Sequence, residues 1–243
     1  MKILKALNAL IDMVVIAALV LAGTYALYAL WDNHRIYAAA ENVQAELLRL
    51  KPDAAQDSAA SFARLLKINP DVCAWVTLEG THIDYPVMQG RDNLGYLNTD
   101  AYGNFALAGS IFLDARCDRG FHDRFSLLYG HHMEGGRMFG DLERYEDGEF
   151  FAAHSAGTLY LPDGAHELEI FACLRLGASE EMIFAPQQAE RAALLDFASQ
   201  HSLHLRPEVI DRLRDDAAPP ILGLSTCSSA FTDARTVVLA AIL

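Results

Sequence analysis

The sequence predicts a mainly β domain that follows an N-terminal membrane-spanning helix. Three observations lead to this prediction. A run of nineteen residues, 13–31, contains no charged side chain. From Val72 onward the chain divides into short segments rich in β-branched and aromatic residues, which Gly, Asp, Asn and Pro separate. One later segment, 186–202, has apolar residues along one side of a helix and polar residues along the other.

The apolar run matches the thickness of a membrane. At about 1.5 Å per residue it spans close to the ~30 Å hydrocarbon core of a bilayer. Lys2 and Lys5 precede the run, so we expect residues 1–35 to form a single-pass anchor with a cytoplasmic N-terminus and an exported remainder. A cleaved signal peptide and a buried core helix are the alternatives. The following residues, LWDNHRIY, contain no small-x-small cleavage site.

Two helical segments separate this anchor from the β region. Residues 36–50 are rich in helix formers with apolar side chains at helical spacing. Pro52 indicates a break, and residues 58–68 form a second short helix that ends before Asn69-Pro70, because the residue before proline disfavours helix. We therefore expect a helical stalk over 36–56 and a globular domain over 57–243.

Eight segments of the globular domain have the character of β-strands. Short strands separated by turn residues are typical of a closed barrel or of a sandwich. The helical segment 186–202 interrupts them. The eight are VCAWVTL, THIDYPVM, GSIFLD, FSLLYGH, AGTLYL, HELEIFACLRL, PPILGLSTC and RTVVLAAIL.

Composition excludes some classes of partner and ligand. The net charge is −13, from 32 acidic and 19 basic residues, which argues against nucleic acid because a polyanion requires a basic surface. His122, His131 and His132 are the candidate ligands for a metal. The sequence contains no His-Glu-x-x-His and no Cys-x-x-Cys spacing, which argues against such a site. We expect no metal and no cofactor.

The strongest chemical signal lies near the C-terminus. Cys227 ends the apolar run ILGLSTC, and Arg235 opens the next strand after a loop of seven residues. If the two strands pair as a hairpin, the thiol and the guanidinium share one end of the sheet, and Ser225 lies on the face of Cys227. A thiolate that attacks a peptide carbonyl creates an oxyanion, which a fixed cation stabilises. A structural cysteine beside a surface arginine is the alternative.

A histidine is the expected partner for such a thiol. His131 follows the strand FSLLYG, where a strand gives way to a Gly-rich turn. Thiol catalysis needs a group that takes the thiol proton or protonates the leaving amine. The neighbouring His132 is the alternative acid/base, since sequence spacing alone does not connect either histidine with residue 227.

At this point the sequence resembles the class B sortases, over essentially its whole length. Four stretches in order carry the resemblance, behind an N-terminal apolar segment. They are INPDVCAWVTLEGTHIDYPVMQGRDNLGYL, GSIFLDARCD, YGHHMEGGRMFGDLERY and LSTCSSAFTDARTVVLA. The resemblance implies an eight-stranded sortase β-barrel with extra N-terminal helices and one helix before the nucleophile strand.

The resemblance also implies an activity and its residues. It implies cleavage of a C-terminal sorting signal on a secreted protein, through a Cys227 thioester. Transfer would follow to an amine of the Gram-positive cell wall (a peptidoglycan stem or cross-bridge amine) or to a pilin lysine. Cys227 would be the nucleophile, His131 the general acid/base and Arg235 the oxyanion-stabilising or substrate-positioning residue. The implied substrate-binding residues are Tyr129, Ser225 and Thr226.

Two hypotheses other than a transpeptidase stay open, and the second of them depends on the four cysteines. A hydrolytic cysteine protease would use the same residues with water as acceptor. A non-enzymatic surface protein would be stapled by disulfides between Cys73 and Cys173 or between Cys117 and Cys227, because exported proteins with an even cysteine count often contain them. We expect Cys73 and Cys173 to be buried free thiols within apolar strands, and Cys117, in a polar turn, to be exposed.

Overall fold

The computed structural model describes residues 2–52, 58–215, 217–227 and 233–243 of the chain. Side chains are described for all of these except residues 2, 3, 6, 58 and 227. The chain divides into two units, Met1–Ala39 and Ala40–Leu243. The predicted boundary between residues 56 and 57 lies outside the described residues, so the stalk and domain limits stay predictions.

The N-terminal segment is helical throughout its described length. Helix α1 (Lys2–Leu47) runs without interruption from the apolar run into the segment expected as a stalk, and a 3-10 turn, η1 (Leu48–Leu50), follows it. The stretch Leu7–Leu50 has a mean hydropathy of 2.2 in its most apolar window, and none of that window is buried. By length and composition this helix is able to cross a membrane.

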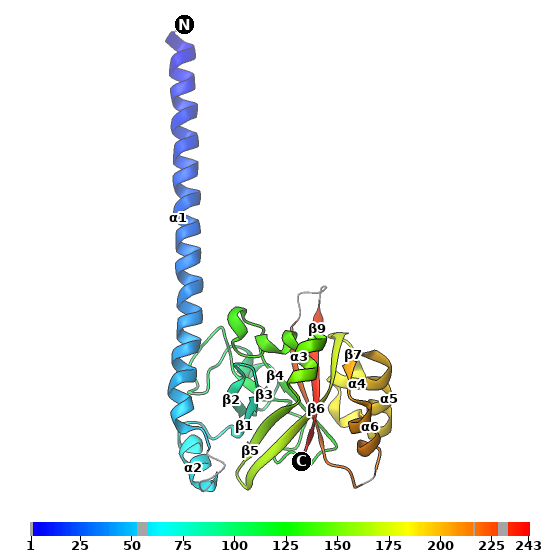
Figure 1. The fold of residues 1–243 in the computed structure, drawn as a ribbon. Helices are drawn as coiled ribbons and strands as arrows, with labels where there is room; N and C mark the ends of the chain where they lie inside the picture. The colour runs from blue at the N-terminus through cyan, green and yellow to red at the C-terminus, as the bar shows by residue number, and fades with distance from the viewer. Residues whose placement is uncertain (1, 53–57, 216, 228–232) are drawn as a thin grey trace. The chain divides into compact units, whose positions relative to one another are not determined.

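The second unit is built on a closed β-barrel (Figure 1). Its strands follow the order β5-β1-β2-β3-β4-β8-β9-β6, and a pairing between β5 and β6 closes the ring of eight, with β7 added beside β6. The eight-stranded barrel implied by the resemblance is therefore confirmed. The strands are β1 (Val72–Leu78), β2 (Asp84–Met88), β3 (Ile111–Leu113), β4 (Phe125–Tyr129), β5 (Ala156–Leu161), β6 (Gly164–Gly177), β7 (Ser202–Leu205), β8 (Ile221–Cys227) and β9 (Ala234–Ile242).

Strand β6 closes the barrel because it is long and irregular. Its first part, 164–169, pairs with β5, and residues 168–177 pair with β9. The register with β9 shifts between Ile170 and Ala172, as at a β-bulge. A bulge bends a strand and increases its twist, which allows one strand to serve two neighbours around a curved sheet.

All eight predicted strands are present, and one further strand was not predicted. The short β7 pairs with β6 at the outer edge of the ring. It occupies the last residue of the predicted helix 186–202 and the three residues after it. This strand has four residues and pairs with one neighbouring strand. So short a segment gives too few alternating apolar and polar residues to be recognised as a strand from the sequence.

The helices are α2 (Ser58–Ile68), α3 (Gly148–Ala153), α4 (Glu181–Phe184), α5 (Arg191–His201) and α6 (Pro207–Leu213). The prediction of a helix over 58–68 is confirmed. The single helix predicted over 186–202 is wrong in its limits, because Ala189 and Glu190 adopt extended backbone angles between a 3-10 turn, η5 (Pro186–Gln188), and α5. Extended angles at two successive residues interrupt the helical hydrogen bonding.

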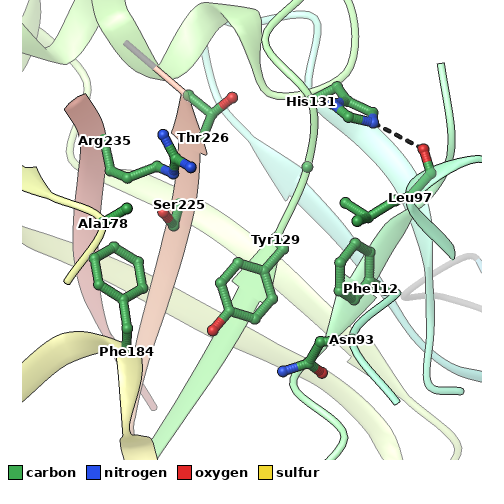
Figure 2. A pocket seen from close by; sticks show the side chains of 11 residues that line it. Asn93, Leu97, Phe112, Tyr129, His131, Ala178, Phe184, Ser225, Thr226 and Arg235 are labelled. Atoms are coloured by element: carbon green, nitrogen blue, oxygen red, sulfur yellow. Dashed lines mark hydrogen bonds between the residues drawn. The ribbon is translucent and has the colours of Figure 1, made fainter. Parts of the chain in front are cut away.

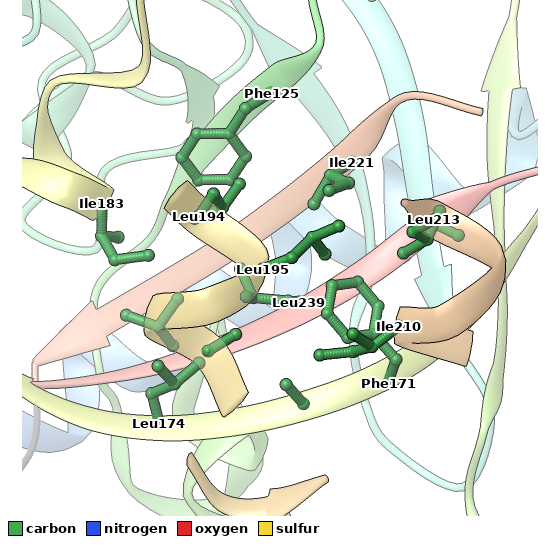
Figure 3. Packing of buried hydrophobic residues seen from close by; sticks show 14 of the residues in the cluster. Phe125, Phe171, Leu174, Ile183, Leu194, Leu195, Ile210, Leu213, Ile221 and Leu239 are labelled. Carbon is green, nitrogen blue, oxygen red and sulfur yellow. The ribbon is translucent and has the colours of Figure 1, made fainter. Parts of the chain in front are cut away.

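Helices α4, α5 and α6 cover one side of the barrel, as Figure 1 and the packing in Figure 3 show. Leu194 and Leu195 of α5 and Ile210 of α6 are buried against side chains from β4, β6, β8 and β9. Burying one such side chain stabilises the fold by about 1.5–3 kcal/mol. The strand residues that pack against these helices are Phe125, Phe171, Leu174, Ile221 and Leu239.

A second core cluster joins the stalk end of the chain to β1 and β2. Leu47 at the end of α1 and Phe62 and Leu65 of α2 are buried with Trp75 of β1. Trp75 donates its indole N–H to Asp84 Oδ1 at 2.6 Å, so its one polar atom is satisfied within this cluster. The end of α1, helix α2 and strand β1 therefore share one packed cluster.

We expect Leu195→Ala to lower the free energy of unfolding by about 2–5 kcal/mol, because it removes a fully buried side chain and leaves a cavity. Leu203, which is 42% exposed on β7, is the control, and Leu203→Ala should change the same quantity by about 0.5 kcal/mol or less. Urea unfolding of the full chain in detergent micelles measures both. Equal losses would contradict the packing of α5 on the sheet.

Candidate active site

Three strands bring the predicted residues to one end of the barrel. Strands β4 and β8 pair in parallel, with Tyr129 opposite Ser225. Strands β8 and β9 pair antiparallel, with Cys227 directly opposite Arg235. The predicted hairpin of the two C-terminal strands is therefore confirmed. The side chain of Cys227 and most of the loop after it, residues 228–232, lie outside the described residues.

Gly130 connects the end of β4 to the segment that carries His131. Its N–H donates to the Ser225 carbonyl at 3.1 Å, which extends the β4–β8 pairing by one residue. A Cβ atom at this position would lie 2.4 Å from Ile111 Cδ1 and 2.8 Å from the ring of Phe139. Only glycine fits so close to these side chains, and this explains the glycine before the histidine.

A cavity of about 280 Å³ lies where these strands end (Figure 2). It brings together all the predicted site residues whose side chains are described. Tyr129 forms its centre in Figure 2, with His131 on one side and Arg235 and Thr226 on the other. The lining residues are Asn93, Leu97, Phe112, Tyr129, Gly130, His131, Ala178, Phe184, Ser225, Thr226 and Arg235.

His131 is held in one orientation by a backbone carbonyl. Its Nε2 lies 2.8 Å from the oxygen of Leu97 (dashed line in Figure 2). A carbonyl oxygen only accepts, so Nε2 carries a proton and donates it to Leu97, and in the neutral ring Nδ1 is the nitrogen without a proton. The His131 carbonyl in turn accepts the N–H of Phe139 at 3.0 Å, which closes the loop behind the histidine.

The neighbouring histidine has a different environment. His132 Nε2 lies 3.1 Å from Glu143 Oε2, and His132 does not line the cavity. Consecutive residues of an extended segment point in opposite directions. The geometry thus distinguishes the two histidines that the sequence left as alternatives.

Two hydroxyl groups in the cavity lining are buried without a partner. Ser225 and Thr226 are 1% and 2% exposed, and neither hydroxyl has a hydrogen-bond partner among the residues described. A buried polar group without a partner costs about 1–3 kcal/mol. Both residues line the cavity, so these two hydroxyls belong to its wall.

Arg235 supplies the positive charge of the site. The partly buried guanidinium lies beside Thr226 in Figure 2. Within the described part of the chain its one hydrogen bond runs from Nη1 to the Ala234 carbonyl, at 3.0 Å. Its other N–H groups are therefore able to donate to an anionic or carbonyl oxygen in the cavity.

Several lining residues were missed by the sequence reasoning. Phe112 and Tyr129 form an aromatic pair with ring centroids 5.3 Å apart, and Phe184 of α4 adds a third ring to the cavity. Asn93 and Leu97 come from the long connection between β2 and β3. No local pattern in the sequence marks these residues, because the cavity forms from strands and connections that are far apart in the chain.

The structure changes the interpretation of the cysteines. Cys73, Cys117 and Cys173 are all buried free thiols. The expectation that Cys117 is exposed is wrong, because the turn that contains it folds inward and leaves it 6% exposed. The proposed disulfides Cys73–Cys173 and Cys117–Cys227 are excluded, and with them the argument for a disulfide-stapled surface protein.

No metal site accompanies the cavity in the described residues, where no three His, Cys, Asp or Glu side chains converge. His122, one of the three histidines considered for a metal, pairs instead with Asp118 at 2.7 Å on the exposed surface. The groups that line the cavity are an imidazole, a guanidinium, hydroxyls and aromatic rings. Together with a thiol at residue 227 they include groups suited to acid/base and nucleophilic chemistry.

Comparisons with known proteins agree on one family. No protein-family model matches the chain. It is 31% identical to Sortase B of Staphylococcus aureus over 186 residues, which cover 75% of this chain and 74% of that protein. It is 42% identical to Sortase B of Listeria monocytogenes over 108 residues, and this match spans 44% of each chain, less than half of the Listeria protein.

Solved structures show the same similarity in three dimensions. A mutant form of Clostridium perfringens sortase B superimposes with a TM-score of 0.74 at 30% identity, covering 82% of this chain and 96% of that one. A Streptococcus pyogenes class B sortase involved in pilus biogenesis gives a TM-score of 0.66 at 35% identity, covering 75% and 97%. A Staphylococcus aureus sortase B-substrate complex gives 0.66 at 27% identity, covering 85% and 94%.

The buried thiols lead to a prediction about reactivity. Burial raises the pKa of Cys73 and of Cys117 to about 12, and it raises that of Cys173 as well, so all three stay protonated at neutral pH. We expect an alkylating reagent to modify the folded chain at Cys227 alone, and all four cysteines in denaturant.

Intact-protein mass spectrometry counts the adducts, and folded Cys227→Ala should take up none. Labelling of Cys117 in the folded protein at the rate seen in denaturant would contradict its burial.

Proposed function

This chain belongs to the class B sortase family of cysteine transpeptidases, and we propose that it cleaves a C-terminal sorting signal on a secreted protein and transfers that protein to an amine. The acceptor is an amine of the cell wall or of a pilin subunit. The observation that carries the proposal is the strand register, in which Cys227 lies opposite Arg235 and Tyr129 lies opposite Ser225, around one cavity that also contains His131.

The reaction follows from the groups at this end of the barrel. The Cys227 thiolate attacks the carbonyl carbon of the scissile peptide bond, and Arg235 stabilises the oxyanion that forms. The carbon–nitrogen bond then breaks, and His131 donates a proton to the departing amine, which leaves a thioester on Cys227. An incoming amine then attacks the thioester carbon and gives a proton to His131, the carbon–sulfur bond breaks, and the Cys227 thiolate and the protonated His131 are restored.

The orientation of His131 supports this assignment. Because Nε2 donates to the Leu97 carbonyl, the proton moves on and off Nδ1 without rotation of the ring. A fixed ring avoids reorganisation at the moment of transfer, which favours catalysis.

The substrate is held, in this proposal, by the remaining lining residues. Ser225 and Thr226 offer unpaired hydroxyls to the peptide backbone of the sorting signal. Tyr129, Phe112 and Phe184 offer aromatic surface to its side chains. Extended peptides are commonly bound in this way, with backbone hydrogen bonds for affinity and pockets for selectivity.

Membrane attachment fits such a substrate. The long apolar helix α1 and the two lysines before its apolar run support a single-pass anchor with the barrel outside the cell. An enzyme held there meets secreted proteins and wall precursors at the same surface. Two of the similar structures, a Streptococcus pyogenes class B sortase involved in pilus biogenesis and a Staphylococcus aureus sortase B-substrate complex, support a substrate of this kind.

The direct test uses the full chain in detergent micelles with a library of quenched sorting-signal peptides, with and without triglycine or a diaminopimelate-like amine. We expect an acyl adduct on Cys227 that passes to the added amine, as seen by mass spectrometry, and no adduct with Cys227→Ala. Cleavage without an amine product would instead indicate a hydrolase. Absence of any adduct across the library would contradict the proposal.

The two adjacent histidines provide a matched pair of variants. We expect His131→Ala to lower the rate of peptide cleavage by about 10²–10⁴-fold, the usual contribution of a general acid/base. His132→Ala should lower it by about twofold or less, since His132 pairs with Glu143 away from the cavity. The same peptide assay measures both, and a larger loss for His132→Ala would reverse the assignment.

A further inference from the structure

We infer that Asp114 is the positioning residue of the substrate cavity: its buried carboxylate fixes the side chains and backbone of three separate cavity walls and thereby sets which peptide binds. This inference rests on the proposed function, because it concerns how the same cavity selects a sorting signal. Asp114 itself does not line the cavity and touches no reacting atom.

Asp114 follows β3 directly and is fully buried, at 0% exposure. Its carboxylate accepts five hydrogen bonds from described residues. Oδ1 accepts from the backbone N–H and the Nε of Arg116, each at 2.9 Å. Oδ2 accepts from Arg116 Nη2 at 2.7 Å, from Asn93 Nδ2 at 2.9 Å and from the Tyr129 hydroxyl at 3.0 Å. Such a carboxylate has no remaining capacity for water.

Two of these donors are cavity residues from different parts of the chain. Tyr129 ends β4, and Asn93 lies in the connection between β2 and β3. Asn93 is held at both ends of its amide, since its Oδ1 also accepts the N–H of Ala115 at 2.8 Å. Both side chains therefore have a single orientation, which one oxygen of Asp114 determines.

The third wall is reached through Arg116. Its Nη2, which bonds Asp114, also donates to the carbonyl of Phe184 at 2.7 Å. Phe184 ends α4 and lines the cavity. The Asp114–Arg116 pair thus connects the short helix α4 to β3 and β4, although α4 is far from them in the sequence. A bidentate guanidinium–carboxylate pair has a defined geometry, so it fixes the position of the Arg116 guanidinium as well as pairing its charge.

The turn that contains Asp114 is itself fixed. Gln89 Nε2 donates to the carbonyls of Asp114 and Cys117, at 3.2 and 2.8 Å. Burial by itself opposes a charge on Asp114, but the hydrogen bonds from Arg116, Tyr129 and Asn93 outweigh it and hold its pKa below the ordinary value. The carboxylate therefore stays ionised at neutral pH and keeps all five donors.

A purely structural role would predict a loss of stability without a change in substrate selection. The arrangement around Asp114 predicts more than this, because Tyr129 and Asn93, which bond it directly, and Phe184, which it holds through Arg116, all line the cavity. Loss of the carboxylate frees Tyr129, Asn93 and the Phe184 backbone together. The chemistry at residues 131, 227 and 235 does not depend on these contacts, so binding and selectivity should suffer more than the chemical step.

The test compares Asp114→Asn with the unchanged full chain in detergent micelles, using a peptide that the wild type cleaves. Asparagine has the same shape but one acceptor oxygen instead of two. We expect KM to rise roughly tenfold or more with kcat within about threefold, and preference among related peptides to weaken. The rate of Cys227 alkylation by a small reagent should stay within about twofold, since it does not require the peptide cavity.

Asp84→Asn is the matched control. Asp84 is also a hydrogen-bonded, partly buried carboxylate, but its partners, Trp75 and Lys51, do not line the cavity. It should leave KM unchanged within about twofold. A double-mutant cycle adds the Tyr129→Phe variant, and we expect its effect on KM to be smaller in the Asp114→Asn background, because the two residues act through one hydrogen bond.

The outcomes separate the two proposals. If the wild type cleaves no peptide, the proposed function fails. If it cleaves but Asp114→Asn leaves KM and selectivity unchanged, or lowers kcat alone, the positioning role fails while the function stands. If Asp114→Asn does not fold, Arg116→Lys replaces it, since lysine keeps a charge but loses the bidentate pair, and an unchanged KM there would equally overturn the inference.

Discussion

The parallel pairing of β4 with β8 is the constraint on which the active site depends. It joins residues about a hundred positions apart in the chain, from Phe125 opposite Ile221 to Tyr129 opposite Ser225. Side chains alternate along a strand, so a slip by one residue would turn every side chain to the other face. The Gly130 N–H to the Ser225 carbonyl continues this register up to the histidine. The relation between residues 131 and 227 is therefore set by the backbone.

The rest of the barrel holds this pairing in place. Strand β9 continues the sheet. Its Arg235 pairs with Cys227 of β8 on one side and with Leu176 of β6 on the other, so three neighbouring strands meet at this position. The bulge in β6 allows the sheet to curve and close on β5. Helices α5 and α6 bury the outer face of these strands. A closed sheet with a packed outer face changes shape little, which suits a site that must keep donors and acceptors in fixed positions.

Buried polar groups are distributed unevenly around this framework. Asp114 has every acceptor position filled, whereas the hydroxyls of Ser225 and Thr226 have no partner among the residues that the structure describes. The satisfied network fixes the side chains around the cavity, and the two hydroxyls are polar groups of its wall. The positive charge of Arg235 is also notable in a protein of net charge −13. Local geometry, and not the overall charge, determines what this site attracts.

The sequence by itself determined eight of the nine described strands, the apolar helix and the candidate residues of the site. Eight strands, the helix over 58–68 and the hairpin that pairs Cys227 with Arg235 all follow from local patterns, because alternation and turn residues act over short distances. Tertiary structure alone decided which histidine lines the cavity, that Cys117 is buried, and that Asp114 joins Asn93, Tyr129 and Phe184 through Arg116. These relations connect residues far apart in the chain, and they exist only after barrel closure has brought the strands together.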